Sequence, residues 1–242
     1  MSEIKKKIAV CISGHLRQPI KGYEKFLEMV IAPNLGSCNF DFFIDTWNVD
    51  DWRKGALSKN VLTCITPGII ESTIRLYQPV LTRIQHNITF DTSKYFMYVK
   101  PGHVKKNSKG EHIPAMYYKI YKSNELKSSY ERDFMFEYDL VIRHRSDFAL
   151  SKPLVFSDDI FEKTKNVIFV ADHKNDMESW YTDVFAFSSS KNMDYYSSLI
   201  VHLDKLVEKH KIFRPEHLLF HHLNKNQSFN VSVLDYEWEI IS

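Results

Sequence analysis

The chain has 242 residues, of which 44% are hydrophobic and 26% are charged. These values are typical of a globular domain and exclude a disordered chain, which would be poorer in aromatic residues and richer in net charge. The formal net charge of +2 is too small to favour nucleic acid as the principal partner, so any recognition of anions must be local. The length fits a single domain spanning residues 1–242.

Cysteine usage and the first residues favour a reducing compartment. The cysteines, Cys11, Cys38 and Cys64, are odd in number and show no CxxC spacing, which argues against a disulfide framework and a structural zinc site. The apolar run that begins at Ile8 is too short for a signal peptide, and no stretch approaches the roughly 20 apolar residues of a membrane span. We therefore expect a cytoplasmic protein that meets any membrane-resident substrate from the surface.

Strand and helix patterns alternate along the chain, which predicts the α/β class. Short apolar and β-branched runs indicate strands, and apolar residues at three- and four-residue intervals indicate helices. The expected strands span residues 8–12, 40–47, 80–90, 140–142, 167–171, 183–187 and 229–234. The expected helices span residues 22–34, 69–77, 114–131, 193–207 and 216–225, with loops over 99–111 and, acidic in character, over 155–166.

Two further stretches carry candidate binding residues, one in the turn after the first strand and one at the start of a helix. Ser13 and Gly14 open a turn after the first strand, where a glycine lets the backbone approach a ligand and Arg17 is placed to hold a phosphate. Tyr117 and Lys119 lie in the first turns of the helix that begins near Pro114. The simpler alternatives are a solvated arginine and a half-buried aromatic helix face. Trp47, at the end of the second strand, is expected to pack in the core.

The most informative stretch is 138–154, YDLVIRHRSDFALSKPL, in which a buried strand runs directly into charge. Ligands of open α/β sheets bind beyond the carboxyl ends of the strands. Arg143, Arg145 and Asp147 at such an end therefore indicate a site for an anion together with a cation or sugar hydroxyls. The alternative is an internal ion pair between Arg145 and Asp147, because ion-pair networks also occupy strand ends.

Several common sites are absent from the sequence. No GxGxxG follows the first strand and no GxxxxGK[ST] occurs, which argues against a nicotinamide enzyme and a P-loop NTPase. GxSxG and HExxH are absent too. His221 and His222 are adjacent, so they cannot share a helix face as metal ligands at i and i+4 do, and we expect satisfied surface or core histidines.

The 138–154 stretch resembles nucleotide-sugar glycosyltransferases of the GT-A fold, in which a strand ends in an Asp-x-Asp motif followed by a Lys-Pro-Leu-like turn. The counterparts here are Arg145-Ser146-Asp147 and Lys152-Pro153-Leu154. Together with ISGHLR, YYKIYKSNELK, DVFAFSSSKNMDYY and PEHLLFHHL, the stretch resembles glycosyltransferase-like proteins of microbial and viral surface-polysaccharide gene sets, over residues 8–223. The resemblance implies a single-domain GT-A (Rossmann-like) fold with a mixed sheet flanked by helices. It also implies transfer of a sugar from a nucleoside-diphosphate donor to a glycan or lipid-linked glycan acceptor.

The resemblance also implies a role for the charged motif. In the family the second aspartate binds Mn²⁺ or Mg²⁺, which implies Asp147 as metal ligand, whereas Arg145 replaces the first aspartate. Two outcomes are open: a metal held mainly by Asp147, or a metal-poor site in which arginines neutralise the diphosphate. The residues expected to bind the donor are Ser13, Gly14, Arg17, Tyr117, Lys119, Arg143, Arg145 and Asp147.

Two carboxylates are candidates for catalysis. Glu216 lies at a helix N-terminus, which favours a carboxylate, and is expected to be the general base if the reaction inverts the anomeric centre. The resemblance implies that Asp183 lies at the position where glycosyltransferases of this fold contact the hydroxyls of the donor or acceptor sugar. The alternatives are a capping glutamate and a turn-forming aspartate. Two other functions use the same residues: a nucleotidyl- or phosphotransferase, and a non-catalytic α/β binding module.

Overall fold

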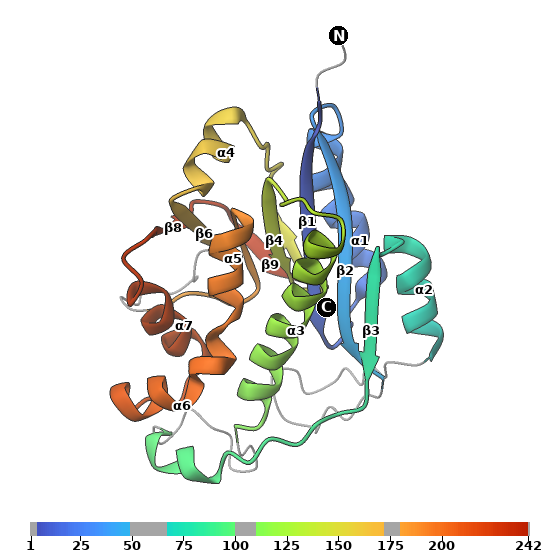
Figure 1. Cartoon of the computed structure of the whole chain (residues 1–242). Helices are drawn as coiled ribbons and strands as arrows, with labels where there is room; N and C mark the ends of the chain where they lie inside the picture. The colour runs from blue at the N-terminus through green and yellow to red at the C-terminus, as the bar shows by residue number, and fades with distance from the viewer. Residues whose placement is uncertain (1–3, 49–66, 100–109, 172–179, 242) are drawn as a thin grey trace.

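The computed structural model describes residues 4–48, 67–99, 110–171 and 180–241. Seven strands form its central sheet: β1 (Lys6–Gly14), β2 (Cys38–Trp47), β3 (Leu81–Gln85), β4 (Leu140–His144), β6 (Val167–Ala171), β7 (Phe185–Ser188) and β8 (Asn230–Leu234). Their order is β3-β2-β1-β4-β7-β6-β8 (Figure 1). Only β7 runs antiparallel to its neighbours, β4 and β6, so the sheet is mixed and mostly parallel.

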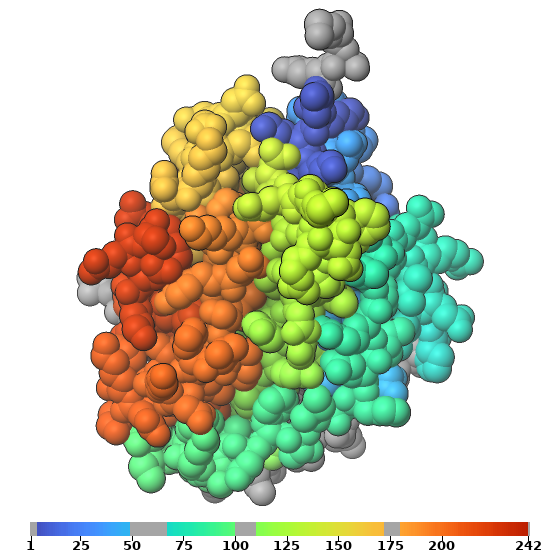
Figure 2. Space-filling view, in the orientation of Figure 1, coloured from blue at the N-terminus to red at the C-terminus, as the bar shows by residue number. Residues whose placement is uncertain are grey.

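Helices cover both faces of this sheet (Figure 1). On one face lie α1 (Pro19–Phe26), which continues as a π-helical turn (Leu27–Ile31) and a 3-10 turn (Ala32–Asn34), α2 (Pro67–Tyr77) and α4 (Asp158–Thr164). On the other lie α3 (His112–Asp133), α5 (Ser190–Ser197), α6 (Leu199–His210) and α7 (Pro215–Asn224). The predicted α/β class, with a mixed sheet between helices, is confirmed. A further 3-10 segment, Ser93–Tyr98, lies against α6, where Lys94 and Tyr95 both donate to Asp204 (Figure 2).

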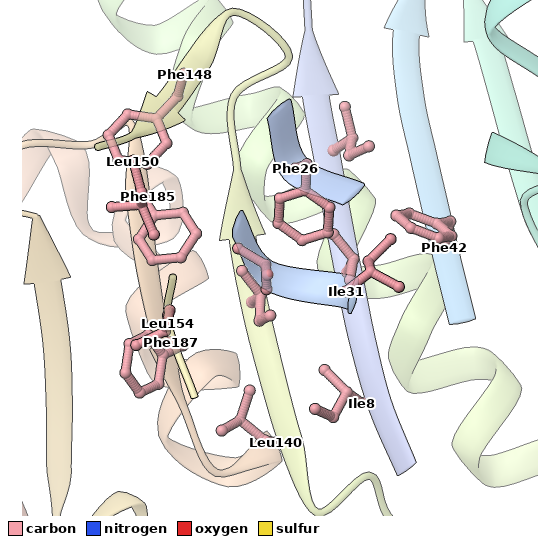
Figure 3. Packing of buried hydrophobic residues seen from close by; sticks show 14 of the residues in the cluster. Ile8, Phe26, Ile31, Phe42, Leu140, Phe148, Leu150, Leu154, Phe185 and Phe187 are labelled. Carbon is pink, nitrogen blue, oxygen red and sulfur yellow. The ribbon is translucent and has the colours of Figure 1, made fainter. Parts of the chain in front are cut away.

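Alternation along the strands divides the core into two layers. Ile8 of β1 packs with Leu140 of β4 and with Phe26 of α1 (Figure 3). Ala9 and Cys11 pack on the other face, beneath α3. Successive side chains of a strand point to opposite faces. Because Cys11 is the register partner of Arg143, the Arg143 side chain lies on the α3 face.

Three expectations from the sequence are wrong. Residues 155–166 were expected to form an acidic loop, but α4 begins there with Ser157 accepting from the Ile160 amide. A serine cap followed by Asp158 and Asp159 is a helix-start pattern that the acidic composition concealed. The expected helix over 193–207 is instead two helices that meet at Ser198.

The third error concerns the chain after β8, because the strand over 229–234 was expected to be the last element. β9 (Trp238–Ile240) instead pairs antiparallel with β5 (Phe148–Leu150) directly after the charged turn. Most of the loop expected over 99–111 lies outside the described residues, as does Cys64, whereas Cys11 and Cys38 are free thiols. Within the described residues, no helix is both long and apolar enough to cross a membrane.

Candidate functional site

The topology gathers polar residues at one edge of the sheet. β7 runs antiparallel and begins where β4 ends, with Phe185 opposite His144. This brings Asp183, just before β7, to the edge where β4 delivers Arg143 and where β1 delivers Ser13. The helix α3 starts at the same edge, since it runs antiparallel to these strands (Figure 1).

Arg143 is the unusual residue of this edge. Arg143 is only 2% exposed. Its Nη1 donates to the His144 carbonyl at 2.6 Å, and its Nε has no hydrogen-bond partner. Among the described residues, no carboxylate lies within ion-pair distance of the guanidinium. Burial lowers the Arg143 pKa, while Tyr196 and Asp183 raise it. A buried charge without a counter-charge is costly, so the guanidinium is suited to receive an anion.

Other buried polar atoms beside Arg143 lack partners as well. Asp183 Oδ2, Ser13 Oγ and the Tyr196 hydroxyl make no hydrogen bond to the described part of the protein. Burial raises the Tyr196 pKa, Arg143 lowers it and Asp183 raises it again, which places Tyr196 near both charges. Buried polar groups are nearly always hydrogen-bonded. Several unsatisfied ones at one strand edge therefore indicate a ligand site.

Helix α3 adds two residues to the wall of this site. The Tyr117 hydroxyl donates to the Pro215 carbonyl at 2.7 Å, and burial followed by the charge of Asp183 raises its pKa. His112 is the first residue of α3, and its side chain is partly exposed to solvent. Partial desolvation lowers the His112 pKa, with Asp183 raising it and Arg17 lowering it. His112 and Tyr196 were missed in the sequence, because periodicity marks a helix position without showing whether its polar atom is satisfied.

The turn after β1 is fastened to the charged turn after β4. Ser146 Oγ accepts from the Arg17 amide at 3.0 Å and donates to the Arg17 carbonyl at 3.0 Å. Gly14 has φ +89°, and no atom lies within 4 Å of an added Cβ, so the position needs glycine for its backbone and faces open space. The structure thus brings together the two stretches that the sequence singled out.

Lys119 has a different environment from the one expected for a donor-binding residue. Its ammonium donates to Asp45, to the Thr46 carbonyl at 3.0 Å and to Gln85 at 2.9 Å. All three of its N–H groups are therefore taken up by protein. Lys119 also lies over the Trp47 ring, which is 3% exposed, so the expected core packing of Trp47 is confirmed. These contacts tie the ends of β2 and β3 to α3.

Asp147 is paired with Arg145. The Arg145 Nε donates to Oδ1 at 2.5 Å and its Nη2 donates to Oδ2 at 3.3 Å. Both carboxylate oxygens thus face a guanidinium, and within the described residues no three His, Cys, Asp or Glu side chains are grouped to hold a metal ion. The internal ion pair that the sequence left as an alternative is present. The Asp147 carboxylate, in this setting, fits a guanidinium better than a divalent cation.

Glu216 lies in the first turn of α7, as the sequence predicted. Its Oε2 is 3.5 Å from the Arg214 Nε, and its charge contributes to the raised Tyr117 pKa, which places the carboxylate near the wall formed by α3. The Arg214 guanidinium in turn stacks over Trp180 at 3.4 Å from the ring centroid. Glu216 is thus held beside the site by α7.

A groove with a volume of about 530 Å³ runs along the outer face of α3. Three of its four charged lining residues are paired within the protein, since Arg83 bonds Asp45 and Glu125 while Asp194 accepts from Lys127; the fourth is Arg132. Neither Arg143 nor its unsatisfied neighbours line this groove. The edge around Arg143 is therefore the better candidate for chemistry.

The adjacent histidines His221 and His222 have separate environments. The His222 Nε2 donates to the Tyr195 carbonyl at 2.8 Å and its ring stacks on the Tyr195 ring, while His221 stacks on His210. Burial lowers the His222 pKa to about 4. His222 is therefore a buried histidine with a hydrogen-bond partner, and His221 is a partly buried one that packs on His210.

His144 makes acid stability a direct test of the packing on the α1 face. Both of its ring nitrogens are buried and unpartnered beside Phe26, and burial together with Arg143 and Arg145 lowers its pKa to about 3. The unfolded chain binds a proton below about pH 6.5 while the folded chain does not, so stability is lost as pH falls. Between pH 7 and pH 5 we expect His144 alone to remove about 2 kcal/mol.

Chemical denaturation of the wild type and of His144→Phe at these two pH values tests this expectation. The variant should lose about 2 kcal/mol less than the wild type on acidification, while His222 continues to titrate in both proteins. An identical loss in the two proteins would show that His144 can be protonated in the folded state.

Comparison with known proteins adds little at the level of sequence: no family model matches the chain, and no curated protein matches it. Among solved structures, the chain is similar to the crystal structure of mouse xyloside xylosyltransferase 1 in its apo form. The TM-score is 0.44 at 8% sequence identity, covering 96% of this chain and 86% of that chain. The likeness is too distant to define a family.

Proposed function

We propose that the chain is a glycosyltransferase that moves a sugar from a nucleoside-diphosphate donor to a glycan or lipid-linked glycan acceptor. The observation that supports this most is the buried Arg143, which lacks a carboxylate partner among the described residues and lies at the carboxyl end of β4. Negative charge grows on the diphosphate as the glycosidic bond breaks, and preorganised cations stabilise it. The adjacent Asp183, with an unsatisfied oxygen, suits the hydroxyls of a sugar.

The proposed reaction is a single displacement. The acceptor hydroxyl oxygen bonds to the anomeric carbon, the bond from that carbon to the diphosphate oxygen breaks, and the nucleoside diphosphate leaves with the electron pair. Arg143 and Arg145 face the leaving group, with Arg17 nearby. Glu216 takes the proton of the acceptor hydroxyl, and Asp183 accepts hydrogen bonds from sugar hydroxyls.

Incubation with a panel of sugar nucleotides tests this function. We expect at least one donor to release its nucleoside diphosphate and to raise the melting temperature, because a ligand that binds only the folded state stabilises it. A nucleotidyl- or phosphotransferase would instead transfer phosphate, and a binding module would gain stability without turnover. If no sugar nucleotide is turned over or raises the melting temperature, the proposed function is wrong.

The two carboxylates are expected to respond differently to neutral replacement. Glu216→Gln should lower kcat by about 100-fold or more, since general bases typically contribute 10²–10⁴. Asp183→Asn should raise KM for the donor as well as lower kcat, because it removes contacts to sugar hydroxyls. The matched control is Glu71→Gln on the exposed face of α2. Wild-type kcat in Glu216→Gln would exclude Glu216 as the base.

Mn²⁺ or Mg²⁺ at Asp147 stays a prediction from the resemblance. The alternative, in which arginines replace the cation, is the one that the geometry of Arg145 and Asp147 favours.

A further inference from the structure

We propose that Arg145, held by Asp147, replaces the divalent cation in this site, so that the nucleoside diphosphate binds without metal. This inference rests on the proposed function and specifies how the same site neutralises the charge of the diphosphate. Asp147 is then a positioning residue, and Arg145 is the group that touches the diphosphate.

The exposure of the pair shows which partner faces outward. The Arg145 side chain is 21% exposed and the Asp147 side chain is 3% exposed. Two of the five guanidinium N–H groups bond the carboxylate, through Nε and Nη2. Three N–H groups therefore remain for a ligand. A planar guanidinium fixed along one edge presents its other edge to a phosphate, a geometry that suits bidentate recognition.

Backbone bonds hold both members of the pair in place. The Arg145 amide donates to the Val184 carbonyl at 2.9 Å, and the Arg145 carbonyl accepts from the Phe148 amide at 2.9 Å. The Asp147 carbonyl accepts from the Ile241 amide at 2.8 Å. The turn is thus bonded to Val184, just before β7, on one side and to Ile241, just after β9, on the other. Because the pair is ordered before the ligand binds, less conformational entropy is lost on binding.

The charge of the edge favours an anion over a cation. Arg145 and Arg143 lie close enough for each to affect the other's electrostatics, since Arg145 contributes to the lowered Arg143 pKa. Arg145 is the more exposed member of the pair with Asp147, so an incoming ligand meets the guanidinium before the carboxylate. A positive charge in that position attracts a diphosphate and repels a divalent cation.

Metal binding at Asp147 would also require the ion pair to break. Mg²⁺ and Ca²⁺ are bound by several oxygen ligands, yet both Asp147 oxygens accept hydrogen bonds from Arg145. A cation at this carboxylate would displace the guanidinium from a residue that is 2% exposed. The pair, once formed, therefore excludes the metal and supplies a positive charge in its place.

The test compares metal-free protein with metal-loaded protein. Wild-type protein treated with EDTA is titrated calorimetrically with UDP, GDP, CDP and ADP in turn, and again with Mn²⁺ and with Mg²⁺. We expect at least one nucleoside diphosphate to bind with a Kd that differs by less than about threefold among the three conditions. Binding that requires Mn²⁺ or Mg²⁺ overturns the inference and leaves the proposed function standing. Absence of binding by all four in every condition overturns the proposed function itself.

A double-mutant cycle then separates positioning from metal binding. In metal-free buffer, Arg145→Met and Asp147→Asn should each weaken binding by about tenfold or more, the scale of a charge-assisted hydrogen bond. Asp147→Asn should cost nothing further in the Arg145→Met background, because Asp147 acts through Arg145. Equal costs in both backgrounds overturn the positioning role. Arg75→Met on α2 is the matched control, and melting temperatures confirm that each variant is folded.

Discussion

Arg143→Met is expected to lower kcat/KM for the sugar-nucleotide donor by about 100- to 1000-fold, the range measured when one preorganised donor to a developing negative charge is removed. The reason is the position of the guanidinium, which is buried at the carboxyl end of β4 and has an unpartnered Nε. Methionine keeps an unbranched apolar stem and removes the charge. The measurement is steady-state turnover with whichever donor the panel identifies.

The stability of the same variant distinguishes a binding residue from a structural brace. A buried charge without a counter-charge destabilises the fold, and replacing buried ionic groups with apolar ones of similar volume is often neutral or stabilising. We therefore expect Arg143→Met to melt at the wild-type temperature or higher, the usual pattern when a group is kept for function. Arg75→Met, on the exposed side of α2, should change neither property. A large drop in melting temperature with intact turnover would make Arg143 a brace.

The sequence predicts the central strands well because their signal is local. Apolar runs alone locate β1, β2 and β4, and the rule that ligands bind at carboxyl ends singles out Arg143. Asp183 lies just before β7 and reaches the same edge because β7 runs antiparallel to β4. What the sequence cannot predict is pairing between segments that are far apart. β9 pairs with β5 although about ninety positions separate them in the chain. Neither strand is long enough to show the alternation of apolar and polar residues that marks a strand.

The environments of the charged residues are only partly predicted. The sequence offered the Arg145–Asp147 ion pair as an alternative to a ligand site, and strand alternation does not decide between the two. Lys119 was expected to bind the donor because it lies in the first turns of α3. Its ammonium is instead consumed by Asp45 and Gln85, which depends on how α3 settles against β2 and β3.

Gly22→Ala is expected to destabilise the protein by about 3 kcal/mol, against the usual preference of helices for alanine. Gly22 lies within α1, where alanine normally gains about 1 kcal/mol. An added Cβ, however, would lie 1.7 Å from the Ser146 carbonyl oxygen. Overpacking commonly costs 1–3 kcal/mol, and we expect about 4 here because the obstacle is backbone rather than a movable side chain. The collision therefore exceeds the gain in helix propensity.

The close approach at Gly22 also sets the position of the site. Ser146 lies between Arg145 and Asp147 and bonds the Arg17 backbone, so a displacement of α1 moves the turn that carries the proposed diphosphate-binding arginine. Gly22→Ala should thus lower the melting temperature by about 6 to 12 °C and also reduce turnover well below the melting transition. The control is Gly36→Ala, since no atom lies within 4 Å of an added Cβ there. Equal melting temperatures in the two variants would show that α1 can move away from Ser146 at little cost.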